Sequence, residues 1–243
     1  MGSPRGTFCA GDGIERLYTV AMIRILASLV ALLPLAVRAD MSIAGWEKVG
    51  SKDGIETYRR EVPGSPLLAI RGVADVNGSL LHVASVLMDT TRITEWMDRV
   101  VEARRIHMSN PLHYIEYERA SVPFPLTDRD FVVESWVEVD AAHKRVLLRS
   151  RSTQHPSAPV TKLVRGEVIS SAFTLYAIDA HRTRVMGEVH MDPKGSIPKW
   201  LVNLVQKGWA HTTITGLRRQ VARVTGPDNP DLEDAMRKAG LIP

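Results

Sequence analysis

The residue types that most often carry out chemistry in proteins form no catalytic or metal-binding pattern in this sequence. Cys9 is the single cysteine, which excludes a disulfide framework and a CxxC metal site. The eight histidines include no HExxH pattern, and the GxSxG, GxGxxG and P-loop patterns are also missing. The sequence therefore predicts no catalytic residue, no metal site and no cofactor.

Acidic residues on one expected strand could serve a binding site instead. Along residues 112–120, Tyr114, Glu116 and Glu118 share one face because side chains alternate along a strand. Neither face of this segment is apolar. Glu116 therefore either faces solvent or lies in a pocket, and the sequence leaves both alternatives open.

The segment 130–139 has a clearer inner face. We expect this face to point inward because the other one carries acidic residues, and its members are Phe131, Val133, Ser135 and Val137. Arg129 and Asp130 are expected to hold the proline-rich loop that precedes them by charge-assisted hydrogen bonds.

A series of strands must position these side chains. Eight segments alternate or are rich in β-branched residues, and Pro, Gly, Asn and Asp turn signals separate them. The predicted strands span residues 57–62, 67–76, 100–108, 112–120, 130–139, 145–153, 168–178 and 183–191. Residues 79–88, between the second and third strands, predict a helix with Ser79 as its N-cap.

The hydrophobic period changes near the end of the chain. From about residue 197 to about Val224, apolar residues recur at helical spacing, which predicts one long amphipathic helix packed on the sheet. Gly226 and Pro227 end this helix. Residues 226–243 are expected to form a short, weakly held tail.

Together these elements predict an α+β protein in which a curved, mostly antiparallel sheet wraps around a long C-terminal helix. A twisted sheet of about eight strands cannot contact one helix over its whole surface, so large side chains or a cavity must occupy the space between them. The chain has only four phenylalanines. We therefore expect an internal hydrophobic cavity, in the range of about 300–1,000 Å³ that is typical of small-molecule sites.

The N-terminal segment resembles an export signal. The apolar stretch 25–37 follows Arg24 and is shorter than the about 20 residues of a bilayer-spanning helix. Val37 and Ala39 are small residues at the positions that a signal peptidase recognises. We expect residues 1–39 to be a leader with a cleaved signal peptide, with Met22 as an alternative start, and the protein to be secreted or periplasmic. An uncleaved membrane anchor is the alternative.

Charge gives little indication of a nucleic-acid partner. The formal net charge is +4 and the sequence pI is near 9.3, but the 31 basic residues are scattered and form no stripe. Because nucleic-acid-binding proteins cluster their basic residues, no nucleic acid is expected as a partner.

Several ordered motifs resemble the steroidogenic-acute-regulatory-related lipid transfer (START) family. They are Trp46, Asp53-Gly54-Ile55-Glu56-Thr57-Tyr58, Ile70-Arg71-Gly72, Leu87-Met88-Asp89, Glu95-Trp96, residues 123–131, Leu163-Val164-Arg165 and residues 192–200. The resemblance covers about Ala44 to Val224, nearly all of the expected mature chain, and we expect residues 44–225 to be one START-like domain. It implies a helix-grip fold, one lipid or sterol in a deep pocket, no catalysis, and an entrance gated by a loop and the C-terminal helix. The segment 154–165 is the candidate gate loop.

The resemblance also implies where a ligand lies. We expect contacts from the inner faces of the strands and from the helix, namely Glu116, Phe131, Val133, Ser135, Leu147, Thr174, Tyr176, Met186, Leu201, Val205, Trp209, Thr213 and Leu217. Some family members place a charged pair deep in the pocket to meet a ligand hydroxyl. The position of the basic partner of Glu116, on the next strand, is Ser135 here.

These expectations define one predicted function and two alternatives. We predict a monomer that binds a lipid or sterol, shields it from water and transfers it between membranes after transient contact with a membrane surface. The first alternative is a helix-grip enzyme of the cyclase or hydrolase kind, with Tyr176, Glu116 and His190 as acid–base groups. The second is a sensor that binds a lipid without transferring it.

Overall fold

The computed structural model describes residues 44–198, 202–203 and 208–243, and strands are its commonest regular element. The expected leader, residues 1–39, lies outside this part of the chain. Within it, ten strands form one sheet in the order β1-β2-β3-β10-β9-β7-β6-β5-β4, with β8 pairing off this path with β6. The paired strands run antiparallel except for β6 and β8, which are parallel.

The strand bounds agree with the sequence prediction to within a few residues for eight strands. These are β2 (Ile55–Arg60), β3 (Ala69–Asn77), β4 (Val100–Asn110), β5 (His113–Ala120), β6 (Arg129–Asp140), β7 (Arg145–Ser152), β9 (Glu167–Asp179) and β10 (Arg182–Asp192). The sequence misses β1 (Glu47–Lys52) and β8 (Val164–Arg165). All six residues of the edge strand β1 are exposed, so no apolar face marks it, and β8 is only two residues long.

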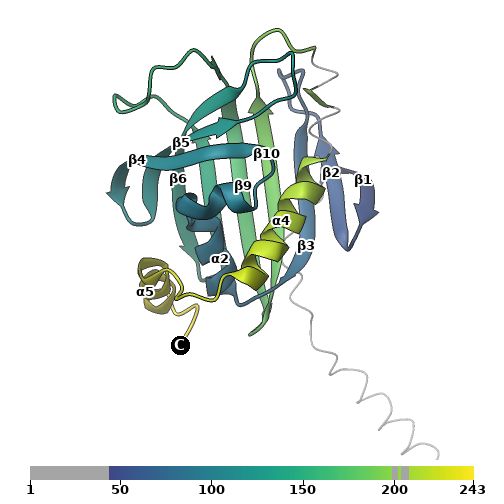
Figure 1. Ribbon diagram of the computed structural model, residues 1–243. Coiled ribbons are helices and arrows are strands. Elements are labelled where there is room, and N and C mark those ends of the chain that lie inside the picture. Colours follow the sequence, from purple (N-terminus) through teal and green to yellow (C-terminus); the bar gives the residue numbers. More distant parts are fainter. Residues whose placement is uncertain (1–43, 199–201, 204–207) are drawn as a thin grey trace, which may run out of the picture. The chain divides into compact units, whose positions relative to one another are not determined.

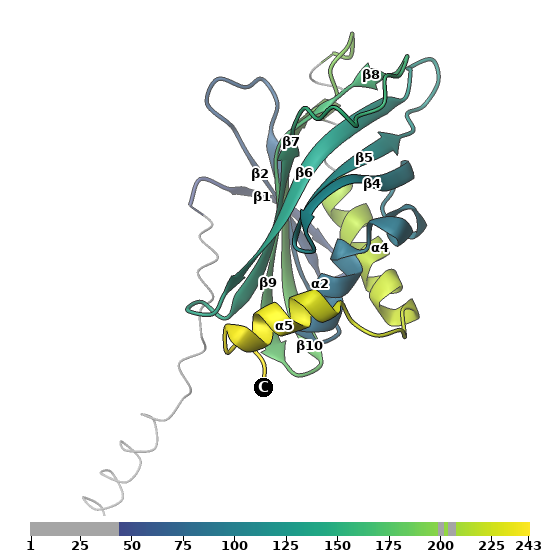
Figure 2. The ribbon, with the colours of Figure 1, turned by 90° about the vertical axis from the view of Figure 1, so that its left-hand side faces the viewer.

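The helices lie against one face of the sheet (Figures 1 and 2). Helix α2 (Leu80–Met88) begins at Ser79, whose hydroxyl accepts a hydrogen bond from the backbone N–H of His82 at 3.1 Å, as predicted. The short 3₁₀ helix η2 (Thr90–Glu95) follows it, and α4 (Trp209–Arg223) crosses β2 and β3. Of the longer C-terminal helix predicted, residues 199–201 and 204–207 lie outside the described part.

Close contact between α4 and its neighbours depends on two glycines. A Cβ added to Gly72 on β3 would lie 2.8 Å from Ile214 Cδ1 and 2.9 Å from Ala210 Cβ. A Cβ added to Gly216 on α4 would lie 2.1 Å from the backbone oxygen of Trp96. Glycine at these two positions therefore lets the backbone of α4 lie close to the sheet and to the segment after η2.

The main hydrophobic core lies between the sheet and the helices. The sheet contributes Val146, Leu175 and Val185, which are completely buried, and α2 and α4 contribute Val83 and Leu217. None of the described helices is long and apolar enough to span a bilayer.

The expectation of a weakly held tail after residue 226 is wrong. Helix α5 (Pro230–Lys238) begins at Asn229, whose side chain accepts a hydrogen bond from the backbone N–H of Leu232. Leu232 and Met236 are completely buried in the main core. These two residues, spaced one helical turn apart, give the helix an apolar face that packs against the protein.

Candidate functional site

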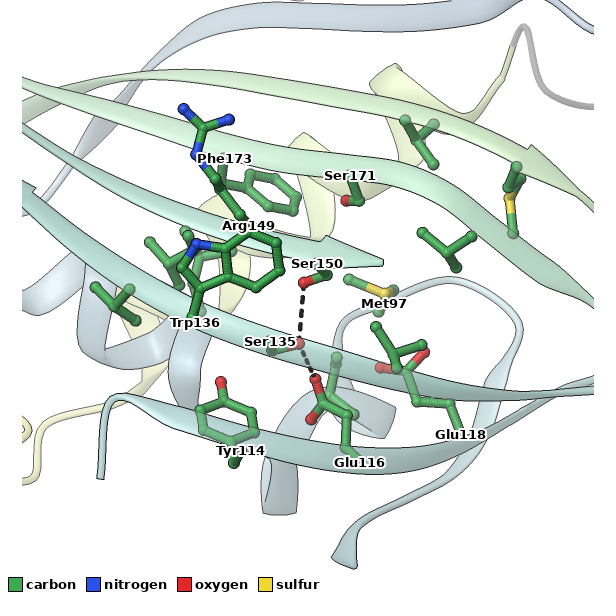
Figure 3. Close-up of a pocket in the computed structure, with 18 of the residues that line it drawn as sticks. Met97, Tyr114, Glu116, Glu118, Ser135, Trp136, Arg149, Ser150, Ser171 and Phe173 are labelled. Atoms are coloured by element: carbon green, nitrogen blue, oxygen red, sulfur yellow. Dashed lines mark hydrogen bonds between the residues drawn. The ribbon is translucent and has the colours of Figure 1, made fainter. Parts of the chain in front are cut away.

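A pocket opens between the inner face of the sheet and the helices (Figure 3). Its volume is about 140 Å³, below the range of about 300–1,000 Å³ that the sequence predicts. The prediction fails because aromatic rings occupy the space. Among the described residues, the aromatic side chains that line the pocket include Trp96, Tyr114, Phe173 and Trp209.

Glu116 of β5 lies in this pocket and is held by two hydroxyl groups. Thr90 Oγ1 donates to Glu116 Oε2 at 2.7 Å, and Ser135 Oγ donates to Glu116 Oε1 at 2.9 Å. Ser135 Oγ also lies 3.0 Å from Ser150 Oγ on β7. Burial raises the pKa of Glu116 even though these hydrogen bonds favour the charged form. The pocket alternative for Glu116 is therefore the one that the structure adopts.

The basic partner of Glu116 comes from the strand before it. Arg105 of β4 lies directly across from Glu116 in the strand register. Its guanidinium donates to Thr90 Oγ1 at 3.3 Å and to the backbone oxygen of Met88 at 2.7 Å. The same group lies 4.0 Å from the centre of the Tyr114 ring. Arg105 thus lies on the same face of the sheet as Glu116 and favours its charged form.

Glu118 lies two residues further along β5 on the same pocket wall. Figure 3 shows its side chain extending into the pocket beyond Glu116, at the end away from Tyr114. No described residue forms a hydrogen bond or an ion pair with its carboxyl group. Burial and the charge of Glu116 raise the pKa of Glu118 to about 8.

Aromatic side chains close the pocket on the helix side. The rings of Phe173 on β9 and Trp209 at the start of α4 lie 6.3 Å apart, a distance typical of favourable aromatic pairs. Trp96, which follows η2, is 3% exposed and also lines the pocket. Its indole Nε1 is buried and has no hydrogen-bond partner among the described residues.

The structure places several predicted ligand contacts in the pocket. Glu116, Val133, Ser135 and Trp209 line it. Phe131, Thr213 and Leu217 are buried, but the described lining does not include them. Leu201 and Val205 lie outside the described residues.

Four predicted ligand contacts are wrong because their side chains point to the face of the sheet away from the pocket. Phe173 lines the pocket, so its neighbour Thr174 points to the opposite face of β9, and so does Tyr176. Thr174 pairs directly with Leu147 on β7 and with Met186 on β10, which places these two on the opposite face as well. A register error of one residue reverses every side chain of a strand, and the sequence of β9 does not fix its register.

The pocket also contains residues that the sequence analysis did not select. Tyr114 and Glu118 share the face of Glu116, so alternation along β5 could have identified them. Phe173, Leu148 and Ser171 require the correct register of β7 and β9. Met97 and Trp96 follow η2 and belong to no periodic pattern, so no sequence signal indicates that they face the sheet.

Arg129 holds the preceding proline-rich loop, as predicted, whereas Asp130 holds the segment 154–165 instead. Arg129 donates to the backbone oxygens of Thr127, Pro193 and Lys194. Asp130 accepts hydrogen bonds from Arg165 Nε at 2.7 Å and from Thr161 Oγ1 at 2.6 Å. Burial opposes ionisation, but these hydrogen bonds lower the pKa of Asp130.

The candidate gate loop, residues 154–165, does not close the described pocket. Asp130 lies on the opposite face of β6 from Val133 and fastens this loop there through Arg165 and Thr161. The rings of His155 in the loop and His107 on β4 lie 4.6 Å apart. None of the residues 154–165 lines the pocket.

A metal site is not formed by the described residues, since they contain no group of three or more His, Cys, Asp or Glu side chains able to hold an ion. The pocket offers instead an apolar and aromatic surface with two carboxyl groups on one wall. Such a site suits a ligand that is mainly hydrophobic and carries one polar end.

A long antiparallel sheet that wraps a C-terminal helix and leaves a pocket between them defines the helix-grip class of proteins. The START domain family model matches residues 31–226. The chain therefore belongs to the START domain family.

Relatives in this family come from bacteria and animals. An uncharacterized protein of Pseudomonas aeruginosa is 25% identical over 174 residues, which cover 71% of this chain and 85% of that protein. START domain-containing protein 10 of Mus musculus is 27% identical over 165 residues, which cover 65% of this chain. The matched region spans only 55% of that mouse protein.

Solved structures show the same fold. The crystal structure of human STARD10 matches with a TM-score of 0.68 at 20% identity, over 80% of this chain and 78% of that one. A STAR-related lipid transfer protein from Xanthomonas axonopodis matches with a TM-score of 0.65 at 26% identity, over 73% of this chain and 99% of that fragment.

Proposed function

We propose that this protein binds a lipid in the pocket between the sheet and α4 and carries it between membranes. The observation that carries the proposal is the pocket itself, which is enclosed by aromatic and aliphatic side chains in a chain of the START family. Removing a lipid chain from water into such a surface is favourable by about 25 cal/mol per Å² of apolar area buried.

Because the pocket is small, it must enlarge before it can hold a lipid. A cavity of about 140 Å³ is too small for a whole sterol or phospholipid. A lipid must therefore displace the aromatic side chains that meet there, and Trp209 at the start of α4 is the one contributed by a helix end. We infer that α4 and Trp209 move away from the sheet when a lipid enters.

A carrier fits the site better than an enzyme does. Of the acid–base groups considered for an enzyme, Tyr176 points to the opposite face of β9, and Arg145 donates to its hydroxyl at 3.5 Å. His190 lies 3.0 Å from Ser65 Oγ and does not line the pocket. Glu116 alone lines it, held by two hydroxyls that restrict its movement.

Delivery requires contact with a membrane, and exposed apolar residues support this step. Phe124 is 96% exposed and Val160 is fully exposed. The loops that carry them leave the sheet side by side, because Val164 N donates to the backbone oxygen of Asp128 and β8 pairs with β6. We propose that these two loops touch the membrane, and that the protein works as a secreted or periplasmic monomer.

The test is native mass spectrometry of the full chain purified from a lipid-containing host, with extraction of the bound molecule. One lipid per chain is expected. Ser171 lines the pocket and its neighbour Ser170 is exposed on the opposite face, so Ser171→Trp should abolish the bound lipid while Ser170→Trp retains it. A wild-type chain that carries no lipid and takes up neither sterol nor phospholipid would rule out the carrier function.

A further inference from the structure

The indole N–H of Trp96 is a buried hydrogen-bond donor without an acceptor. Trp96 lines the pocket and is only 3% exposed, and its Nε1 forms no hydrogen bond with any described residue. Buried N–H groups nearly always have a partner, because leaving one unpaired costs free energy. An acceptor that a ligand brings into the pocket would satisfy this donor.

The segment that carries Trp96 gives the pocket otherwise apolar side chains. Leu87 of α2, Ile93 of η2 and Met97 line it. A buried water molecule normally makes two to four hydrogen bonds with polar groups, and these three side chains supply none. An oxygen atom of a bound lipid needs no such additional partners, because the apolar part of the lipid holds it in place.

A second donor lies on the sheet side of the pocket (Figure 3). Ser135, Ser150 and Ser171 are neighbours across β6, β7 and β9 in the strand register, and all three line the pocket. Ser135 donates its single hydroxyl proton to Glu116, so Ser150 donates to Ser135. Ser171 is half-buried, and its hydroxyl forms no hydrogen bond with another described residue. Its proton is therefore available to a ligand.

Glu118 adds a third donor at neutral pH. Burial and the charge of Glu116 raise the pKa of Glu118 to about 8, so below this pH its carboxyl group keeps a proton that it can donate. These three groups of the pocket wall all offer protons at neutral pH. The group that suits them best accepts hydrogen bonds and has no proton of its own to place.

Charge further restricts the polar end of the ligand. Among the described residues that line the pocket, Arg149 is the one Lys, Arg or His, and it pairs with Glu138 at 3.2 Å on the opposite face of the sheet. A buried anion would therefore lack a counter-charge among these residues and would lie beside Glu116, which makes its burial costly. An ammonium group is unsuitable for a different reason, since it has no acceptor for the N–H of Trp96.

We propose that the pocket recognises lipids whose polar end is an uncharged carbonyl group, as in an ester, amide or ketone, and that Trp96 donates to its oxygen. A carbonyl oxygen has two lone pairs and can accept from Trp96 Nε1 and from a second donor. This inference rests on the proposed lipid binding and names the chemistry of the lipid's polar end. It agrees with the inferred movement of α4, because Gly216 of α4 packs against the backbone oxygen of Trp96.

The test compares four probes that each have ten carbons: 2-decanone, 1-decanol, decanoate and decylamine. Binding to the full chain is measured at about pH 7 by calorimetry. We expect 2-decanone to bind about tenfold more tightly than decanoate, which has no counter-charge, and than decylamine, which has no acceptor. The affinity of 1-decanol should be intermediate, because its oxygen accepts a hydrogen bond but its own proton has no free acceptor.

The variant Trp96→Phe removes the N–H and keeps an aromatic ring. It should bind 2-decanone about tenfold more weakly than the wild type does and bind decylamine unchanged, which also shows that the variant is folded. Trp46→Phe is the matched control, because Trp46 is also nearly buried, at 9% exposed, and is not among the described residues that line the pocket. It should bind all four probes like the wild type.

Two further measurements locate the acceptor. The chain has five tryptophans, and the indole N–H signal that disappears from the nitrogen–proton NMR spectrum of Trp96→Phe belongs to Trp96. Saturating 2-decanone should move this signal downfield, as a new hydrogen bond does, whereas decylamine should not. Ser171→Ala should weaken binding of 2-decanone by a smaller factor than Trp96→Phe does, and Ser170→Ala, on the opposite face of β9, should leave it unchanged.

The outcomes separate this inference from the proposed function. The inference would be overturned, with lipid binding intact, if decanoate or 1-decanol bound as tightly as 2-decanone, or if Trp96→Phe bound 2-decanone like the wild type. An indole signal of Trp96 that does not move would overturn it as well. If Trp96→Phe does not fold, the order of the four probes and the pair Ser171→Ala and Ser170→Ala decide. A protein that binds none of the four probes would overturn both proposals.

Discussion

Glu116 and Glu118 lie on one face of β5, yet their surroundings give them different properties. Glu116 has two hydroxyl donors and a nearby guanidinium, whereas Glu118 has neither among the described residues. The difference arises from β4, η2 and β6, which are distant in sequence. Alternation could place both carboxyls on one wall, but it could not show which of them would lack a partner.

The raised pKa of Glu118 makes stability depend on pH. In the unfolded chain this carboxyl loses its proton near pH 4.3, whereas in the folded protein its pKa is about 8. Between these values the folded state holds the additional proton, so the free energy of unfolding falls as pH rises and levels off above the folded pKa. The pH-dependent loss should be roughly a few kcal/mol for the ligand-free protein.

Urea unfolding from about pH 5 to about pH 9 measures this effect. Glu118→Gln should flatten the decline and be more stable than the wild type at the alkaline end. The control Glu102→Gln should keep the decline, because Glu102 on β4 is 42% exposed and pairs with Arg104 outside the pocket. Glu116 and Tyr114 face the same region and are present in both proteins, so the difference between wild type and variant reports on Glu118. A decline of the same size in Glu118→Gln would contradict the assignment.

At the scale of elements, helices and strands with a regular apolar pattern were predictable from the sequence, whereas the way in which strands and helices meet was not. Ser79 and the apolar spacing of residues 80–88 were sufficient for α2. Strand alternation was sufficient for the inner face of β6, where Val133 and Ser135 line the pocket. The register of β9 was not predictable, because Phe173, Thr174 and Leu175 are all suited to burial and either alternation satisfies them.

The packing of α4 on the segment after η2 gives a prediction for Gly216. In an exposed helix, replacing Gly with Ala stabilises by about 1 kcal/mol. Here the new Cβ would lie 2.1 Å from the backbone oxygen of Trp96, which has no flexible end to move aside. Gly216→Ala should therefore destabilise the protein by about 1–3 kcal/mol in urea unfolding.

Thr215→Ala is the control for Gly216→Ala, because Thr215 is the adjacent residue on α4 and is exposed. Its effect should be small and, from helix propensity, favourable. If Gly216→Ala were as stable as Thr215→Ala, the close approach of α4 to Trp96 would be refuted.

At the scale of the whole molecule, the sequence was informative about the fold because its signals agree with one another. Turn residues separate the strands, the period becomes helical at residues 79–88 and again near the end of the chain, and the START motifs occur in a consistent order. What escaped prediction depends on tertiary contact. Helix α5 is short, and only the burial of Leu232 and Met236 reveals its role. The size of the pocket likewise depends on how the aromatic rings of distant strands meet α4.

The exposed residues of the two loops beside β8 give a prediction for the transfer of lipid between membranes. Phe124 and Val160 have no packing role to lose, since both are almost completely exposed, and Lys162 beside them is exposed as well. Inserting two such side chains into a membrane surface would contribute roughly 3–6 kcal/mol. Phe124→Ser combined with Val160→Ser should slow transfer of a fluorescent lipid between vesicles at least about fivefold, with unchanged affinity for the lipid in solution.

The pair Met108→Ser and Ile169→Ser is the control for transfer, because these residues are also exposed and apolar but lie on β4 and β9. Equal slowing by both pairs would mean that general surface hydrophobicity, rather than the two loops, governs membrane contact. Transfer at the wild-type rate by the loop variant would place the docking surface elsewhere. If only the loop variant transfers lipid more slowly, and it still binds lipid, then membrane docking and lipid binding depend on different residues. A sensor that never delivers its lipid would show no transfer even in the wild type.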